Sequence, residues 1–198
     1  PPPRRRRHPN AAYAAQGPSR ASFMTGRRPA HTRVFDNNAN FRDIGLDTNG
    51  AGDSWVTMPE HFKKSGWLTL GLGKTFHPNH PKNWDEPTSW SQDMPYYQYS
   101  YFIQPNTSAS AYPGGAKQPC PGAGLPKKGG GPSDIDVWCR VDEPHEHFYD
   151  FGLANATVER IKYAKGKATP FFIQAGFARP HAPWRVPADF WDLYGPLL

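Results

Sequence analysis

Residues 57–77 read TMPEHFKKSGWLTLGLGKTFH and predict a helix that is followed directly by a buried strand. Thr57 and Glu60 have the spacing of a capping box, in which each side chain accepts a hydrogen bond from the main-chain N–H of the other residue at the start of a helix. Gly66 suits the left-handed turn that ends a helix. Residues 67–72 are mostly apolar and bounded by glycines, which is typical of a short strand inside a sheet.

A second helix–strand unit follows nearer the C-terminus. Residues 151–165 predict an amphipathic helix that ends at a Lys-Gly-Lys sequence, and residues 170–175 (PFFIQA) predict the next strand. The apolar positions at helical spacing are Phe151, Ala154, Val158 and Ile161, with Lys165 at the edge of this face. Two helix–strand units in succession predict an α/β fold with a mostly parallel sheet and helices on its faces.

Three polar side chains follow the two predicted strands. Lys74 and His77 come directly after the first strand, and His181 follows the second. Because ligands of parallel sheets bind outside the carboxyl ends of the strands, we expect all three at one edge. Lysine can neutralise an oxyanion, and histidine can protonate a leaving oxygen. On the residues alone, a solvated Lys–His pair and a structural His181 packed on Trp184 are the simpler interpretations.

Proline and glycine are abundant, with 23 and 19 copies in 198 residues, and they predict long irregular connections. We expect residues 78–148 to contain little regular structure and to wrap the sheet as extended segments. The aromatic content of 14% supplies enough apolar surface for folding. We therefore interpret the chain as one folded domain of 22.2 kDa.

The formal net charge of +6 comes mostly from Arg4 to Arg7, and the rest of the chain is nearly balanced. An arginine run can pair with the phosphates of a nucleic acid. This run has no interleaved aromatic residues, so we interpret residues 1–9 as a disordered edge or linker and do not expect nucleic acid as a partner. No segment of the sequence is apolar for long enough to span a membrane.

The sequence contains two cysteines, Cys120 and Cys139, with 18 residues between them. A disulfide closing this loop would contribute about 3 kcal/mol to stability, but two unbonded thiols fit the spacing equally well. Asn106 and Asn155 each begin an N-glycosylation triplet, which fits a secretory or lysosomal route. We interpret the histidines of the Pro-His-Glu-His sequence at 144–147 as exposed polar residues, because no third metal ligand accompanies them.

Residues 17–27 read GPSRASFMTGR and predict a short helix over 19–25, with a proline near its start. The exposed N–H groups of a helix N-terminus together with Arg20 would form a binding site for a tetrahedral oxyanion. The alternative is that Arg20 pairs with a carboxylate at the surface, and spacing alone favours that alternative.

The segment 17–27 resembles the signature of the formylglycine-dependent sulfatase family, which is Cys-x-Pro-Ser-Arg followed by Thr-Gly-Arg. Three further segments are similar to the iduronate-2-sulfatase branch of this family: 73–78 (GKTFHP), 139–142 and 171–185. They follow one another in the same order as in that branch. The resemblance implies part of an α/β sandwich of the alkaline-phosphatase and sulfatase type. Residues 10–198 would then be an incomplete N-terminal catalytic domain.

The resemblance also implies hydrolysis of a sulfate ester, with a sulfated glycan or another sulfate ester as the substrate. Arg20 would support the formylglycine nucleophile, while Lys74, His77 and His181 would bind sulfate or assist departure of the leaving group. Arg179 stands where the iduronate branch has a lysine and would contact substrate. The family further implies a calcium cofactor, a lysosomal or secreted location, and a disulfide in the region of the two cysteines.

The chain departs from the family pattern at the nucleophile. Gln16 lies two residues before Pro18, and no cysteine precedes Cys120, so about three residues including the nucleophile are missing before the proline. Ala178 stands where the iduronate branch has a histidine, which puts the sugar specificity in question. The calcium-binding aspartates, a later Asp-His pair and a final sulfate-binding lysine are also absent from these 198 residues.

We therefore expect the chain as given to be inactive, because loss of a covalent nucleophile lowers the rate by many orders of magnitude. The alternative function is a non-catalytic protein that binds sulfated glycans through Arg20, Lys74, His77 and His181. A third hypothesis is a nucleic-acid binder that uses the arginine run. A sheet with missing strands would expose apolar edges, so we also expect poor solubility.

Overall fold

The computed structural model describes residues 16–42, 52–98, 138–181 and 184–194. The chain divides into two compact units. The first unit comprises residues 1–98 with 160–176, and the second comprises residues 99–159 with 177–198. The single domain expected over residues 10–198 stays a prediction.

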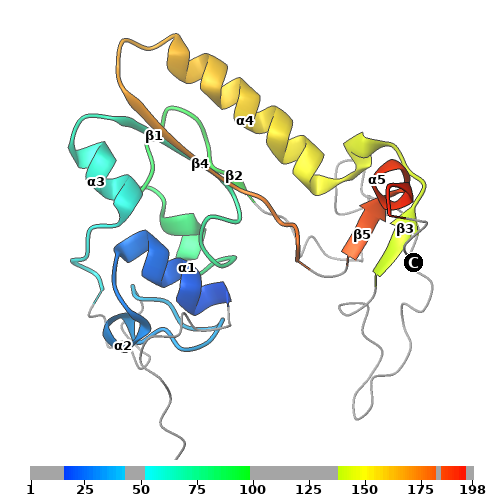
Figure 1. The fold of residues 1–198 in the computed structure, drawn as a ribbon. Helices are drawn as coiled ribbons and strands as arrows, with labels where there is room; N and C mark the ends of the chain where they lie inside the picture. Colours follow the sequence, from blue (N-terminus) through cyan, green and yellow to red (C-terminus); the bar gives the residue numbers. More distant parts are fainter. Residues whose placement is uncertain (1–15, 43–51, 99–137, 182–183, 195–198) are drawn as a thin grey trace, which may run out of the picture. The chain divides into compact units, whose positions relative to one another are not determined.

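The first unit contains a parallel sheet. Its elements are α1 (Gln16–Thr25), α2 (Pro29–Thr32), α3 (Met58–Lys64), β1 (Leu68–Gly73), η1 (Lys82–Asp85), β2 (Tyr97–Gln98), the C-terminal end of α4 (Tyr149–Lys165) and β4 (Phe171–Gly176). The strand order is β2-β1-β4, and both outer strands run parallel to β1 (Figure 1). The α/β class with a parallel sheet, predicted from the sequence, is therefore confirmed.

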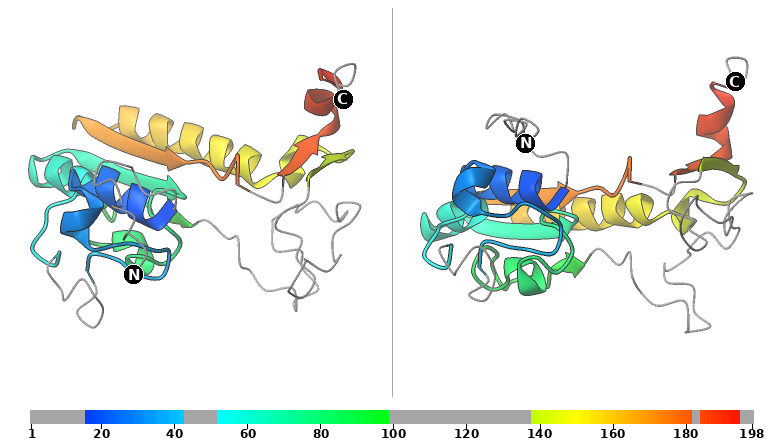
Figure 2. Two further views of the ribbon diagram at one scale, coloured as in Figure 1. Left: turned by 60° about the horizontal axis from the view of Figure 1, so that its bottom comes forward. Right: turned by 90° about the horizontal axis from the view of Figure 1, so that it is seen from below.

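Helices cover both faces of this sheet. Leu68 and Leu70 of β1 pack with Ala164 of α4 on one face. On the other face, Phe62 of α3 stacks on Phe172 of β4, with ring centroids 4.8 Å apart. Figure 2 shows α1 on the same side of the sheet as α3. The alternation of side chains along each strand thus gives the sheet two apolar faces, and each one receives a helix.

The first helix–strand unit forms as its sequence predicts. The Thr57 hydroxyl accepts a hydrogen bond from the N–H of Glu60, and the Glu60 carboxylate accepts one from the N–H of Thr57, both at 3.3 Å. The helix ends at Lys64, and Gly66 takes the left-handed conformation with φ of 83°. These features place the start of β1 within one residue of the prediction.

The second unit contains a two-stranded parallel sheet that the sequence did not predict. Its elements are β3 (Trp138–Val141), η2 (His145–His147), the N-terminal part of α4, β5 (Trp184–Pro187) and α5 (Ala188–Asp192). Strands β3 and β5 pair from Trp138 opposite Trp184 to Val141 opposite Pro187. Four-residue strands are too short to show a period, and the proline in β5 argues against a strand, so no local pattern indicated this sheet.

Helix α4 forms as predicted, but it buries a different face. Phe151, Val158 and Ile161 are 41%, 47% and 39% exposed, whereas Leu153 and Ala164 are fully buried. Three of the apolar residues that fall at helical spacing are therefore exposed in the structure. A small residue such as Ala164 lets the helix approach the sheet closely, and this packing decides which side turns inward. None of the helices in the described part of the chain, α4 included, is long and apolar enough to cross a membrane.

Candidate active site

The ends of β1 and β4 lie side by side, as the sequence predicted. The last pair of the ladder is Gly73 opposite Gly176, and the N–H of Lys74 donates to the carbonyl oxygen of Gly176 at 2.7 Å. A Cβ atom on Gly176 would collide with the main chain of Lys74 and Thr75, so the two strand ends approach closely only because this residue is glycine. Lys74 therefore lies at the edge of a parallel sheet where ligands bind.

Arg20 joins helix α1 to this strand end. Its Nη1 atom donates to the carbonyl oxygen of Lys74, and it lies 3.3 Å from the carbonyl oxygen of Thr75. These main-chain contacts hold the guanidinium at the strand end. Arg20 therefore contacts the main chain of Lys74, while the convergence of the two side chains on one oxyanion and their roles in chemistry stay predictions.

Lys74 is a buried cation, with 2% of the residue exposed. Burial, followed by repulsion from the Arg20 guanidinium, lowers the pKa of Lys74 from 10.5 to about 8. Both effects disfavour the ammonium form. An anion bound beside Lys74 and Arg20 would oppose both of them, so the strand end is suited to an oxyanion.

Tyr96 completes the buried surroundings of this strand end. Its hydroxyl donates to the carbonyl oxygen of Gly73 at 2.7 Å and lies 2.6 Å from the Thr75 hydroxyl. Burial raises the pKa of Tyr96, despite its hydrogen bonds with Thr75, so the phenol stays protonated. No local pattern in the sequence indicated this residue, because Tyr96 lies 23 positions beyond Gly73, the last residue of β1, and meets the strand only in the folded chain.

His77 is partly buried in the turn that follows β1. Its carbonyl oxygen accepts a hydrogen bond from the N–H of His80 at 2.9 Å, and the two imidazole rings lie 5.7 Å apart. Sequence analysis identified His77 but missed His80, which extends the pattern to Lys-x-x-His-x-x-His. The repeated three-residue spacing is the feature of the sequence from which His80 could have been identified.

The N-terminus of α1 is less open than the sequence suggested. The helix begins at Gln16, and the N–H of Gly17 donates to the Asn37 side-chain oxygen at 2.8 Å. A Cβ on Gly17 would lie 2.8 Å from the carbonyl oxygen of Asp36. An amide expected to face an oxyanion is thus occupied by a side chain from the chain itself, and Arg20 supplies the positive charge that α1 contributes here.

His181 and Arg179 belong to the second unit, so their predicted approach to Lys74 stays a prediction. The Asp150 carboxylate accepts hydrogen bonds from the main-chain N–H groups of Ala178 and Arg179, at 2.8 and 3.0 Å. The Arg179 guanidinium donates to the carbonyl oxygen of His181 at 2.8 Å. The segment after β4 is therefore held by α4 and by its own contacts.

In the second unit, the packing of His181 on Trp184 stays a prediction, and the structure gives other contacts for Trp184 and for His145. The Trp184 indole donates to the carbonyl oxygen of Pro180 at 2.6 Å, which occupies its N–H group. His145 lies 3.0 Å from the Asp189 carboxylate and stacks on Phe190, with centroids 5.6 Å apart. The His145 side chain is 42% exposed, in line with the expectation that it is an exposed polar residue, and α5 supplies partners that the local sequence did not reveal.

Several predicted features lie wholly or partly outside the described residues. Cys120, Asn106 and the arginine run are among them. Cys139 belongs to β3, and its pairing with Cys120 stays a prediction. Asn155 lies on α4 and is exposed, as a glycosylation acceptor must be.

The described part of the chain does not contain a group of side chains that could bind calcium. Calcium requires six to eight oxygen ligands, several of them from carboxylates. In residues 16–42, 52–98, 138–181 and 184–194, no three His, Cys, Asp or Glu side chains are grouped as a metal site requires. Calcium thus stays an implication of the resemblance, and no chemical step is assigned to it.

The chain was compared with proteins of known function. It is 34% identical over 189 residues to the iduronate 2-sulfatase of Homo sapiens and 33% identical over 189 residues to that of Mus musculus, in each case over 93% of this chain and 30% of the relative. A protein named sulfatase from Formosa agariphila is 31% identical over 179 residues, which cover 90% of this chain and 32% of that protein.

The chain thus spans about 30% of the length of these curated relatives. A family model described as "Sulfatase" matches residues 10–195, which is most of the chain. Taken with the signature around Arg20 and the strand end that carries Lys74, this match shows that the chain belongs to the sulfatase family.

Proposed function

We propose that this chain forms the sulfate-binding part of a sulfuric ester hydrolase of the iduronate-2-sulfatase type, which acts on sulfate esters of glycans. The observation that carries the proposal is the burial of Lys74 beside Arg20 at the carboxyl end of β1. Two relatives bear the name iduronate 2-sulfatase, which supports the iduronate-type assignment.

In this proposal the two cations bind the sulfate and stabilise the charge that develops on it. Arg20 supplies a permanent charge, and Lys74 supplies an ammonium at pH values below about 8. Both groups are fixed before substrate arrives, since Arg20 is held by the carbonyls of Lys74 and Thr75 and the main chain of Lys74 is held by Gly176. Such prearranged charges lose little free energy to reorganisation during the reaction.

Histidine supplies the proton chemistry. His77 lies three residues beyond Lys74 and would protonate the leaving oxygen or bind a sulfate oxygen, and His181 would share this task. Arg179 would contact the substrate beyond the sulfate. These assignments follow the family resemblance.

The chain as given is proposed to bind sulfate esters without hydrolysing them. Gln16 and Gly17 precede Pro18 where the family carries its cysteine, so no residue at the start of α1 can become formylglycine. This makes a non-catalytic binder of sulfated glycans the second candidate function. The two candidates share the anion site and differ only in turnover, and the glycosylation triplets suit a lysosomal or secreted location for both.

Binding and turnover can be measured on the same chain. We expect calorimetry with a heparin-derived disaccharide to give at least about tenfold weaker binding for Lys74→Met, because a charge-assisted hydrogen bond is lost. Lys82→Met is the matched control, since Lys82 is exposed and lies outside this strand end. Equal binding by Lys74→Met and the unaltered chain would contradict the proposed site.

Sulfate release from the same disaccharide separates the two candidates. We expect no release by the chain as given, and release by a variant in which a cysteine before Pro18 has been restored and converted to formylglycine. If the restored variant binds but still does not release sulfate, the non-catalytic binder is favoured.

A further inference from the structure

Two apolar side chains on the N-terminal part of α4 are exposed to solvent. Phe151 is 41% exposed and Val158 is 47% exposed, whereas Leu153, on the opposite side of the helix, is fully buried. The exposed Asn155 lies between them, because it follows Phe151 by four residues and precedes Val158 by three. Residues at these spacings are neighbours on the surface of a helix, so the three side chains form one outward-facing patch.

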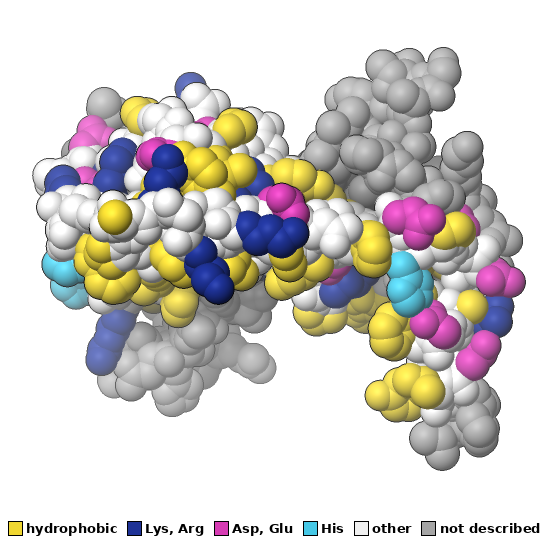
Figure 3. All heavy atoms as spheres, turned by 90° about the horizontal axis from the view of Figure 1, so that it is seen from above, with side chains coloured by type: hydrophobic (Ala, Val, Ile, Leu, Met, Phe, Trp, Pro, Cys, Tyr) yellow, Lys and Arg dark blue, Asp and Glu magenta, His cyan; other side chains and the backbone are white. Residues whose placement is uncertain are grey.

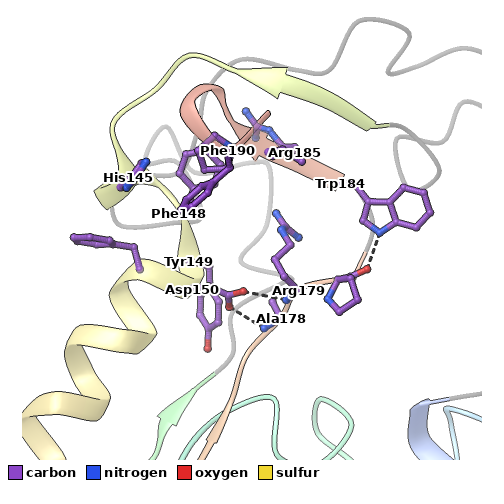
Figure 4. Close-up of a pocket in the computed structure, with 13 residues that line it drawn as sticks. His145, Phe148, Tyr149, Asp150, Ala178, Arg179, Trp184, Arg185 and Phe190 are labelled. Carbon is purple, nitrogen blue, oxygen red and sulfur yellow. Dashed lines mark hydrogen bonds between the residues drawn. The ribbon is translucent and has the colours of Figure 1, made fainter. Parts of the chain in front are cut away.

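The aromatic member of this patch has a ring contact that favours one orientation. The centroids of the Phe151 and His145 rings lie 6.5 Å apart, and the ring planes are inclined at 63°. His145 lies near the start of α4 (Figure 4), and its own ring is 3.0 Å from the Asp189 carboxylate. Edge contacts at this distance favour a defined orientation of an aromatic ring. Phe151 thus offers an oriented apolar surface that is still open to solvent.

Asn155 also begins the triplet Asn-Ala-Thr, which is an acceptor sequence for an N-linked glycan. In the folded helix the Thr157 hydroxyl donates to the carbonyl oxygen of Leu153 at 2.7 Å. The hydroxyl is part of the acceptor sequence, so this bond indicates that a glycan is transferred to Asn155 before α4 forms. Such an order fits a chain that is modified during its synthesis.

We propose that Asn155 carries an N-linked glycan whose first sugar covers Phe151 and Val158. In the transfer, the Asn155 amide nitrogen forms a bond to the anomeric carbon of N-acetylglucosamine and releases one proton. The bond from that carbon to the diphosphate of a lipid-linked oligosaccharide breaks, and the diphosphate leaves with the bonding electrons. The inference rests on the lysosomal or secreted location that accompanies the proposed function.

Helix geometry directs the first sugar toward Phe151. Each Cα–Cβ bond of a helix is tilted toward the N-terminus, so a side chain covers the turn that precedes it. The Asn155 side chain therefore leans toward Phe151, and Val158 leans toward Asn155. A sugar ring has an apolar face of C–H groups that can stack on an aromatic ring, while its hydroxyl groups stay in water and keep their hydrogen bonds. The glycan thus suits a patch that is open to solvent and apolar on both sides of its attachment point.

The acceptor is tested with the full chain, expressed behind a cleavable secretion leader in cells that make oligomannose glycans and purified from medium and cells. We expect peptide mass spectrometry to find the glycan on Asn155 and Asn155→Gln to lack it. Asn106→Gln, which removes the other triplet, should keep the glycan on Asn155. Thr157→Ser should keep it as well, because Asn-Ala-Ser is also an acceptor sequence. An unmodified Asn155 in the purified chain would overturn the proposal.

Light scattering of the same preparations tests whether the glycan covers the patch. Asn155→Gln should at least about double the weight-average mass, because uncovered apolar patches associate. Trimming the glycan enzymatically to one N-acetylglucosamine should leave the mass of the protein part unchanged, since the first sugar is the one that covers Phe151. In a chain that carries Phe151→Ser and Val158→Ser, Asn155→Gln should have no effect on association.

Three results would overturn the covering role of the first sugar. They are equal association of the glycosylated chain and Asn155→Gln, association that rises after trimming, and an effect of Asn155→Gln that persists without the two apolar side chains. Phe151 and Val158 are exposed, so their replacement is compatible with folding, and far-UV circular dichroism checks this. Lys74→Met tests the proposed sulfate site separately, since Lys74 belongs to the first unit and Asn155 to the second.

Discussion

At the residue scale, the buried ammonium group of Lys74, which is proposed to bind the ligand, also affects the stability of the folded chain. The pKa of Lys74 is about 8 in the folded chain, whereas the ordinary value for a lysine, which applies in the unfolded chain, is 10.5. Between these pH values the unfolded chain holds more protons than the folded chain, so the Lys74 contribution makes the folded state more stable as the pH rises through this window. At pH 7 the buried ammonium therefore destabilises the folded chain.

We predict that Lys74→Met raises the free energy of unfolding at pH 7 by up to about 3 kcal/mol, since each pKa unit corresponds to about 1.4 kcal/mol. The gain over the unaltered chain should shrink by about 2 kcal/mol between pH 7 and pH 9.5. Urea titrations at the two pH values measure both quantities. Lys82→Met controls for the loss of an exposed lysine, and a gain from Lys74→Met that does not depend on pH would contradict the explanation.

Arg42 illustrates a second residue whose importance depends on burial. Its Nε and Nη2 atoms donate to the two oxygens of Asp85 at 2.8 and 2.9 Å, and Nη2 also lies 3.4 Å from Glu60. The Asp85 side chain is only 4% exposed. Residues 83–85 all have positive φ values without any glycine, and this strained run ends at the carboxylate that Arg42 holds.

We predict that Arg42→Gln destabilises the chain by about 3–5 kcal/mol, because it leaves a buried carboxylate without its charge partner. Arg140 offers a matched control, since it makes the same two-bond contact with Asp192 at 2.9 Å, but both groups are exposed. Arg140→Gln should change stability far less. Equal losses in urea titrations of the two variants would show that geometry, rather than burial, determines the effect.

The positions of candidate site residues could be predicted where these residues belong to a recognisable local sequence motif. The signature around Arg20 and the position of Lys74 after a strand placed both residues at one strand end, and Arg20 does contact the main chain of Lys74 there. Arg42 and Tyr96 could not be predicted in the same way. Their partners are 43 and 21–23 positions away in the sequence, and nothing in their own surroundings specifies those partners.

At the element scale, one of the two sheets could be predicted from local sequence patterns and the other could not. The β1–β4 pair was predictable, because each strand has six residues, follows a well-marked helix and is bounded by glycine or proline. The β3–β5 pair was not, because each strand has only four residues and β5 ends in a proline. The buried face of α4 was also missed, because packing against the sheet, rather than the pattern within the helix, decides it.

The close approach of β4 to the end of β1 gives a test at this scale. We predict that Gly176→Ala lowers stability by about 1–3 kcal/mol and weakens binding of a sulfated disaccharide, because the added methyl group displaces the main chain of Lys74. Gly66→Ala is the control, since its Cβ would meet nothing within 4 Å and only its φ of 83° opposes the change. It should cost about 1 kcal/mol and leave binding intact. Unaltered binding by Gly176→Ala would contradict this role of the strand contact.

At the scale of the whole molecule, the described residues include large apolar side chains that are exposed. Phe151, Val158 and Ile161 form an exposed stripe on α4, and Leu193 and Tyr194 after α5 are 71% and 62% exposed. Figure 3 shows hydrophobic side chains at the surface among lysine and arginine side chains. Exposed apolar patches promote association, which supports the poor solubility expected from the sequence.

We predict that Val158→Lys reduces self-association of the isolated chain, because it places a charge in the middle of the α4 stripe. Light scattering over a range of protein concentrations measures the effect. Asn155→Lys adds the same charge at an exposed polar position one turn away, so it separates loss of apolar surface from a change in net charge. If the two variants reduce association equally, net charge is responsible and the stripe is not the contact surface; if only Val158→Lys does, the chain associates through the apolar face of α4.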